Sequence, residues 1–135
     1  MVTCALVASF TRPMPRTVLE ETRLHPAIRD KVANLNADIV HNVAAASSSN
    51  PVLVVGMAGN PHVRRARKLL DAAGIAYHYL EFGSYFSEWH RRLALKMWTG
   101  WPTFPMVFVK GTLIGGASDL ERLVTGGELK RILGE

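Results

Sequence analysis

The most regular feature of this chain is a set of short apolar runs between longer stretches with a helical period. Residues 52–55 (Val-Leu-Val-Val) and 106–109 (Met-Val-Phe-Val) are continuously apolar and bounded by turn-forming residues. Runs of this length and composition are typical of strands that are buried on both faces. Residues 76–81 and 112–114 predict two further strands, so the sequence predicts a four-stranded sheet.

Residues 26–46 carry the longest helical pattern in the chain. Pro26 suits the first position of a helix, where its missing N–H is not needed. The apolar positions recur mostly at spacings of three and four: Ile28, Val32, Leu35, Ile39, Val40 and Val43. Asn34 or Asn36 is expected to divide this stretch into two helices. Residues 1–23 lack such a period and are broken by prolines, which predicts an irregular segment.

A third helix is expected directly after the first strand. Asn60 is a favoured N-cap residue, Pro61 suits the first turn, and Gly74 provides a C-terminal cap. This helix joins the strands at 52–55 and 76–81, so these strands should be parallel, with a right-handed crossover.

Residues 88–97 predict a fourth helix, capped by Ser87. Trp89, Leu93 and Met97 recur every four residues and therefore share one face. We expect this face, and Trp89 in particular, to point toward the core.

Residues 103–105 (Thr-Phe-Pro) predict a stiff corner that enters the strand at 106–109. Proline cannot donate to a sheet ladder, so Pro105 should stand at the very start of that strand. The corner can then turn backbone groups outward to a ligand. Lys110-Gly111 is a two-residue turn into the strand at 112–114, which predicts a β-hairpin.

Two short helices, at 119–124 and 128–133, are expected to end the chain. Ser118 precedes the first of them and Glu121 stands three residues later, a spacing that predicts a capping box.

The predicted order is helix, strand–helix–strand, helix, strand–strand, helix, helix. Four strands of mixed direction with helices on both faces form an α/β architecture that resembles thioredoxin. We assign residues 1–34 to an N-terminal extension, irregular and then helical, and residues 35–135 to the domain itself.

The chain is moderately basic, with 135 residues and a formal net charge of +5. A basic balance favours anionic ligands or surfaces. The basic residues are spread through the chain without an RNP, helix-turn-helix or zinc-finger pattern, so we expect no nucleic-acid partner. The five histidines lack metal-ligand spacing, so no metal site is expected.

Cys4 is the single cysteine, which excludes an intramolecular disulfide and a Cys-x-x-Cys site. Because this usage fits a reducing compartment, we expect a cytoplasmic protein. No apolar run approaches the roughly 18 residues of a membrane span, so no membrane association is expected. Residues 3–10 are interpreted as a loose terminus, with a signal peptide as the alternative. Arg12 and Arg16 also leave a transit peptide open.

Several runs resemble the glutaredoxins, and the monothiol class most closely. Residues 101–105 (W-P-T-F-P) match that family's W-P-T-[FI]-P segment, which contains its cis-proline. Residues 109–116 (V-K-G-T-L-I-G-G) match its final hairpin, V-x-G-x-L-[VI]-G-G. Residues 127–129 (G-E-L) resemble its C-terminal helix, and residues 50–52 (N-P-V) resemble the start of its first strand. The resemblance implies a thioredoxin-like fold over about residues 35–135.

The resemblance fails at the reactive centre. The family's C-G-F-S run falls on residues 60–63 (N-P-H-V), so Asn60 holds the cysteine position. Met57 falls where a lysine can meet the glutathione carboxylate. Thiol–disulfide exchange requires a thiolate, and the family's shared iron–sulfur cluster uses the same sulfur. We therefore expect neither catalysis nor a cluster of the usual kind; a substitute role for Cys4 is the alternative.

Other parts of the family's glutathione groove are present. The resemblance implies that Arg92 meets a ligand carboxylate. It also implies that the backbone of Thr103 and Phe104, before the cis-proline Pro105, meets the cysteinyl part of glutathione as an added strand.

A second part of the groove corresponds to the family's G-C-D run. Gly116, Ala117 and Ser118 occupy its place, where backbone amides at a helix N-terminus bind the γ-glutamyl carboxylate. Ser118 lacks the charge of the family's aspartate. Asp119 is the nearest acid and is expected to compensate in part.

Some of these residues also have simpler interpretations. Asn60 can serve as a helix cap alone, and Arg92 can be a surface arginine. The basic residues at 64–68 can form a solvated face or an anion funnel. Trp98 and Trp101 can pack at the rim or form a partner surface.

Three hypotheses follow. The first is a glutaredoxin-related protein without thiol–disulfide catalysis that retains part of a groove for glutathione or an extended peptide. The second is a protein-interaction or homodimerisation module in which the N-terminal helices, Trp98 and Trp101 carry the partner surface. The third is a glutaredoxin-type oxidoreductase or iron–sulfur protein of cell redox homeostasis that uses Cys4.

Overall fold

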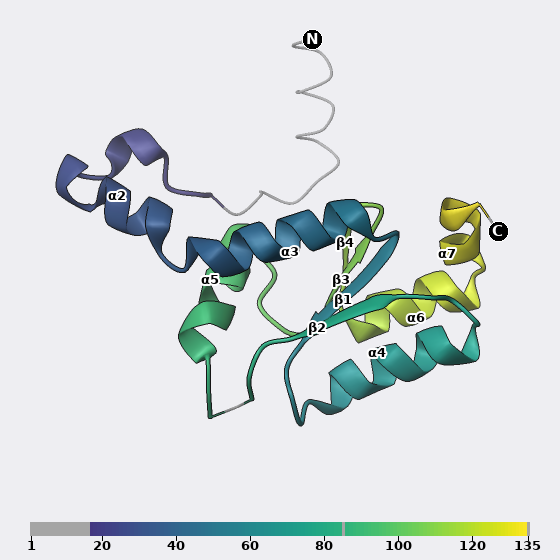
Figure 1. Ribbon diagram of the computed structural model, residues 1–135. Helices are drawn as coiled ribbons and strands as arrows, with labels where there is room; N and C mark the ends of the chain where they lie inside the picture. The colour runs from purple at the N-terminus through teal and green to yellow at the C-terminus, as the bar shows by residue number, and fades with distance from the viewer. Residues whose placement is uncertain (1–16, 85, 135) are drawn as a thin grey trace, which may run out of the picture. The chain divides into compact units, whose positions relative to one another are not determined.

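The computed structural model describes residues 17–84 and 86–134 (Figure 1). The described chain forms two units, one ending at Asn34 and the other beginning at Leu35. In chain order the elements are η1 (Glu21–Arg23), α2 (Pro26–Asn34), α3 (Ala37–Ser49), β1 (Val52–Gly56), α4 (Pro61–Ala72), β2 (His78–Glu81), α5 (Trp89–Thr99), β3 (Met106–Val109), β4 (Thr112–Gly115), α6 (Ala117–Thr125) and α7 (Glu128–Leu133).

The four-stranded mixed sheet expected from the sequence is confirmed. Its strand order is β2-β1-β3-β4, with β1 parallel to β2 and antiparallel to β3, and β3 antiparallel to β4. Val54 of β1 lies opposite Tyr79 on one side and Val107 on the other. The crossover through α4 makes β1 and β2 parallel, whereas a two-residue turn makes β3 and β4 antiparallel.

Helices cover both faces of this sheet, so β1 and β3 are buried along their whole length. Successive side chains of a strand point to opposite faces. Leu53 and Val55 pack with residues of α3 and α5, whereas Val52 and Val54 pack with residues of α4, α6 and α7. Figure 1 shows α3 on one side of the sheet, and α4 and α6 on the other. Burial on both faces explains why these strands are continuously apolar.

Two turns form where the sequence predicted them. Asn36 has a φ of 47° between α2 and α3, a left-handed conformation that asparagine tolerates and that ends the helical path. Lys110 and Gly111 have φ of 50° and 80°. Positive φ at both central residues is the requirement of a type I′ hairpin turn, whose twist matches that of the flanking strands.

The predicted orientation of α5 is wrong. Trp89, Leu93 and Met97 do share a face, but their side chains are 54%, 43% and 57% exposed. The helix instead buries Arg92 and the small and aliphatic side chains of Ala94 and Leu95. Spacing identifies residues that share a face, but it cannot decide which of two partly apolar faces meets the core.

The predicted caps of two helices are also wrong. α6 begins at Ala117, one residue before Ser118, and the carboxylate that accepts from the N–H of the N-cap residue is that of Asp119 instead of Glu121. The N-cap of α5 is Glu88, with a φ of 55° and no capping hydrogen bond from its side chain. Ser87 Oγ instead accepts a hydrogen bond from the backbone N–H of Ser84 at 3.1 Å. The Ser118 hydroxyl instead bonds to Arg65 of α4, whereas the Ser87 hydroxyl bonds within its own connection.

Candidate functional site

The corner before β3 forms part of the wall of a cavity of about 250 Å³. The Phe104–Pro105 peptide bond is cis. Phe104 is buried and packs in the core between the sheet and helices α3 and α5, whereas Thr103 is exposed. The cavity is lined by His62, Trp101, Thr103, Phe104, Pro105, Gly116, Ala117, Ser118 and Asp119. A rigidly supported corner thus presents its outer side to an open cavity.

Asn60 closes the end of α4 that meets this corner. Its Oδ1 accepts hydrogen bonds from the backbone N–H groups of His62 at 2.9 Å and Val63 at 3.4 Å. Its Nδ2 donates to the backbone oxygen of Phe104 at 3.4 Å, across 44 residues of sequence. The residue is 8% exposed. Both ends of the amide are therefore used inside the fold, the first of them as the predicted N-cap.

The N-terminus of α6 forms another part of the wall. Asp119 Oδ2 accepts a hydrogen bond from the backbone N–H of Gly116 at 3.0 Å. Helix geometry leaves the N–H groups of Ala117 and Ser118 without an intrahelical acceptor. Arg65 Nη2, from α4, donates to Ser118 Oγ at 2.8 Å. This wall therefore combines backbone donors and a carboxylate, with a guanidinium group beside them.

Trp101 contributes a further donor next to this turn. Its Nε1 atom is buried and has no hydrogen-bond partner among the described residues. This indole nitrogen lies close to the start of α6. A Cβ atom at the position of Gly116 would be only 3.8 Å away from it. Because a buried donor without an acceptor costs free energy, a ligand oxygen placed there would be stabilised.

Arg92 lies apart from the cavity. The residue is only 6% exposed, and its Nη1 atom donates to the backbone oxygens of Phe82 at 2.9 Å and Ser87 at 2.6 Å. It ties α5 to the connection that follows β2, and it does not line the cavity. The structure thus corrects the interpretation of Arg92 as a solvated surface residue, and Arg92 does not line this cavity.

The other sequence-predicted residues are brought together. Thr103, Phe104 and Pro105 meet the Gly116–Ser118 turn around one cavity, although the two runs are separated by a hairpin. Sequence reasoning missed His62 and did not assign Trp101 to the wall. The signals that could have found them are local, because His62 follows Asn60 in the first turn of α4 and Trp101 opens the corner segment.

The basic side chains of α4 are partly committed to the fold. Arg65 reaches Ser118, and Arg67 Nε donates to the Tyr77 hydroxyl at 3.2 Å, which raises the pKa of Arg67.

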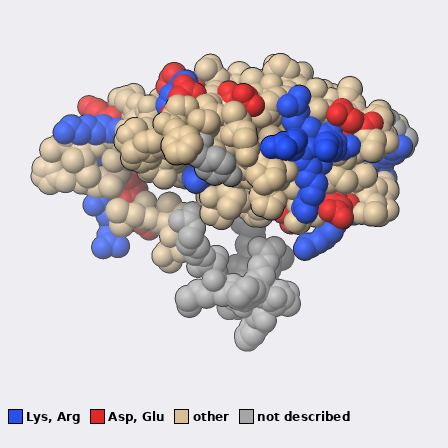
Figure 2. All heavy atoms as spheres, turned by 90° about the horizontal axis from the view of Figure 1, so that it is seen from below, with Lys and Arg blue, Asp and Glu red and all other residues tan. Residues whose placement is uncertain are grey.

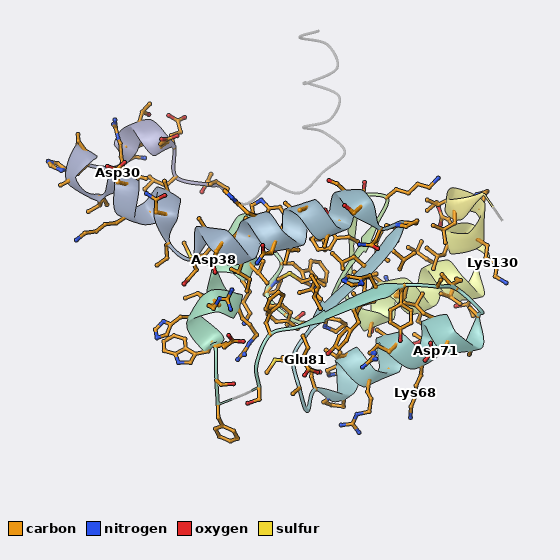
Figure 3. All side chains as sticks on the ribbon, viewed as in Figure 1. Asp30, Asp38, Lys68, Asp71, Glu81 and Lys130 are labelled. Carbon is orange, nitrogen blue, oxygen red and sulfur yellow. The ribbon has the colours of Figure 1, made fainter. Side chains whose placement is uncertain are left out.

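Burial, and then a hydrogen bond to Glu81, raises the pKa of Tyr79 to about 12. Figure 2 shows Lys and Arg side chains gathered in a cluster, and Figure 3 shows Lys68 extending from α4.

The described residues contain neither a helix that could span a membrane nor a cluster of metal-ligating side chains. No helix within 17–84 or 86–134 is long and apolar enough to cross a membrane. Across the same residues, no three His, Cys, Asp or Glu side chains gather where they could hold a metal ion. Cys4, the alternative nucleophile, lies outside the described residues.

Fold and site together define a thioredoxin-like α/β protein with a cavity beside a cis-proline corner. The glutaredoxin family model matches residues 52–114. A glutaredoxin-like protein of Dictyostelium discoideum is 47% identical over 102 residues, covering 76% of this chain and 83% of that protein. A probable monothiol glutaredoxin of Legionella pneumophila, GrlA, is 33% identical over 69 residues, covering 51% of this chain and 74% of that protein.

Solved structures agree with these sequence matches. A buckwheat glutaredoxin–glutathione complex superposes with a TM-score of 0.66 at 26% identity, covering 75% of this chain and 92% of that one. The chain therefore belongs to the glutaredoxin family. Its single cysteine is Cys4, and the resemblance places Asn60 at the position of the family's reactive cysteine.

Proposed function

We propose that this protein does not catalyse thiol–disulfide exchange and instead holds glutathione or an extended peptide in the cavity beside Phe104. The observation that carries the proposal is the pair of hydrogen bonds by which the Asn60 side chain is held to the backbone. An amide cannot supply the thiolate that exchange requires, and both of its polar ends already bond to the backbone. Iron–sulfur ligation of the family's usual kind needs the same missing sulfur.

The cavity offers two kinds of backbone recognition. The corner at Thr103 and Phe104 suits an extended ligand that adds as a strand. The Phe104 oxygen, however, already accepts the 3.4 Å bond from Asn60, so a ligand N–H would have to share or replace it. The N–H groups of Ala117 and Ser118 at the start of α6 suit a carboxylate. The known glutathione complex of a similar structure supports glutathione as the first ligand to test.

Side chains at the same wall would refine this recognition. Asp119 supplies the carboxylate of this wall, and we expect it to meet the ammonium group of a γ-glutamyl ligand only in part, because one of its oxygens already accepts from Gly116. Arg65, in place of Arg92, is the guanidinium group beside this wall. We propose that Arg65 contributes the attraction for a ligand carboxylate that the resemblance attributed to Arg92.

An activity assay tests the absence of catalysis. The full chain and its Cys4→Ser variant are assayed for reduction of hydroxyethyl disulfide with glutathione. We expect no turnover by either protein. Clear turnover that survives Cys4→Ser would overturn the non-catalytic proposal, whereas turnover lost with Cys4 would favour the alternative oxidoreductase. Aerobic and anaerobic absorbance spectra of the purified protein would show any cluster.

A titration tests the groove independently. Glutathione is added to labelled protein while the Phe104 and Ala117 amides are followed by NMR, with the amide of Lys110, at the other end of β3, as the control. We expect saturable shifts at Phe104 and Ala117 and little change at Lys110. Equal behaviour of all three amides at high glutathione concentration would contradict ligand binding in the cavity.

A protein-interaction module is the second candidate, and exposed aromatic residues favour it. Trp98 is 44% exposed, although its ring lies over Phe108 with centroids 6.1 Å apart. Trp101, in contrast, lines the cavity, so it is the less suitable half of the predicted partner surface. A pulldown that compares wild type with Trp98→Ala tests this candidate, and equal recovery of partners would contradict a role for Trp98.

A further inference from the structure

Two residues that line the cavity have ionisable side chains, and they are His62 of α4 and Asp119 of α6. The other lining residues carry neutral side chains or none. Histidine is the side chain whose charge normally changes between pH 5 and 8, whereas carboxylates stay ionised in this range. Protonation of His62 would therefore add a positive charge to the cavity wall. The proposed function gives this residue no role.

His62 lies on the flank of α4 that faces α6. Arg65 follows three residues later, so the two side chains lie one turn apart on the same flank. Arg65 Nη2 lies 2.8 Å from Ser118 Oγ and 3.9 Å from Glu121 Oε2, and both of these atoms belong to α6. His62, one turn before Arg65, lines the cavity together with the residues that begin α6. The imidazole and the guanidinium group are thus neighbours beside the same backbone donors.

The backbone of His62 is fixed, but its side chain is exposed. Its N–H donates to Asn60 Oδ1 at 2.9 Å, and Asn60 Nδ2 donates to the backbone oxygen of Phe104 at 3.4 Å. A single amide therefore connects the first turn of α4 to the corner. Because the cap uses the backbone N–H of His62, the imidazole can be replaced without removing this bond.

We propose that His62 is a specificity-determining residue, and that its protonated imidazole binds the ligand carboxylate held at the start of α6. This inference rests on the proposed function and names a further group at the same site. The carboxylate would accept from the N–H groups of Ala117 and Ser118, with Arg65 and His62 beside it. The cavity then selects a ligand with a free carboxylate at this end, such as a γ-glutamyl peptide, and binds it more tightly as the pH falls.

The other charged groups around the imidazole keep their charge between about pH 5.5 and about pH 7. They are Arg65 on α4, Asp119 on α6 with Arg122 Nη1 at 4.0 Å from its carboxylate, and Lys96 on α5, whose Nζ lies 5.7 Å from the ring centroid of Phe104. The corner itself carries no charged side chain. Asp119 also attracts a protonated imidazole, and solvent screens an exposed pair, so the expected gain in affinity is about threefold.

Glutathione titrations at about pH 7 and about pH 5.5, followed at the Ala117 amide by NMR, test this role. We expect about threefold tighter binding by the wild type at the lower pH, and the same affinity at both values for His62→Gln. The matched control is His41→Gln, which changes an exposed histidine of α3 on the other face of the sheet and should behave as the wild type does. The ring-proton titration of His62 should also move to higher pH when glutathione is present.

Two analogues of glutathione test which carboxylate His62 meets. γ-Aminobutanoyl-cysteinylglycine lacks only the α-carboxylate of the γ-glutamyl residue, and its binding should not depend on the charge of His62. The glycyl ethyl ester of glutathione keeps that carboxylate and should keep the dependence. The reverse pattern would overturn the proposed contact, as would a pH dependence that survives in His62→Gln.

The outcomes also separate this inference from the groove itself. Saturable shifts of the Phe104 and Ala117 amides with equal affinity at both pH values would leave the groove intact and remove the role of His62. Absence of such shifts at both pH values would contradict the groove, and the role of His62 with it.

Discussion

Two helices begin beside the same corner, but their N-termini differ in what they leave open. α4 begins behind Asn60, whose side chain takes up the N–H groups of His62 and Val63. α6 begins behind Gly116, which has no side chain, and Asp119 binds only the N–H of Gly116 itself. The first turn of α4 is thus closed by its own cap, whereas the first turn of α6 keeps backbone donors that line a cavity.

The difference shows that one helix end can stabilise the fold while the neighbouring helix end stays available to bind a ligand. A donor satisfied inside the protein stabilises the fold and has little left for a ligand. A donor left open costs some stability and is ready to bind an anion. The family resemblance places the reactive sulfur at the closed end and the carboxylate-binding amides at the open end, and the predictions below test this assignment.

Placing a thiol at the capped start of α4 should have the largest effect, which is a gain of reactivity. Asn60→Cys, made in the Cys4→Ser background, places a thiol where the N–H groups of His62 and Val63 favour the thiolate, with a thiol pKa below about 8.5. We expect this variant to release the chromophore of a disulfide reagent, whereas the Cys4→Ser parent, which has no thiol, should release none. A thiol that stays inert in the folded variant would show that the corner cannot support family chemistry.

Removing the cap should cost about 2 kcal/mol of unfolding free energy, because Asn60→Ala loses the N-cap bonds and the bond to the Phe104 oxygen. Urea unfolding measures the loss. Asn60→Ser is the matched control, since its hydroxyl retains an acceptor for the first turn and should recover roughly half of the stability. Equal losses in both variants would show that side-chain volume, and not capping, matters at this position.

A smaller loss is expected at the open end. Asp119→Ala should cost about 1 kcal/mol, because the N–H of Gly116 loses its acceptor. The 4.0 Å ion pair with the exposed Arg122 is also lost, but such a pair adds little. Asp119→Asn keeps an acceptor oxygen and should be close to wild type in the same urea experiment. A loss at Asp119 as large as that at Asn60 would contradict the contrast between the two helix ends.

The smallest effect is expected for Ser118→Asp, which restores the acidic residue of the family. We expect glutathione to bind a few-fold more tightly, because a carboxylate can meet the ligand's ammonium group. The gain is limited by Arg65, which contacts Ser118 Oγ at 2.8 Å and would pair with the new carboxylate. NMR titration of the Ala117 amide measures the change, and a weaker affinity would contradict this placement of the ammonium group.

Local sequence patterns were sufficient to predict most helices and strands and several residues of the cavity. Continuous apolar runs predicted β1 and β3, because burial on both faces leaves no polar position. Asn60 and Pro61 predicted the start of α4, and Lys110-Gly111 predicted the hairpin. These features depend on residues next to one another in the chain. The family motifs then indicated that the corner and the Gly116 turn would meet.

The contacts between distant segments depend on tertiary packing, which the sequence patterns did not predict. The spacing of Trp89, Leu93 and Met97 defined a face, but packing against α3 and the sheet buried the opposite one. Arg92 turned inward because backbone oxygens of another segment were within reach. Asn60 could be recognised as a cap, but its bond to Phe104 spans 44 residues and depends on how α4 and β3 are brought together. Local patterns carry no information about such distances, because the sheet and its two helical layers set them.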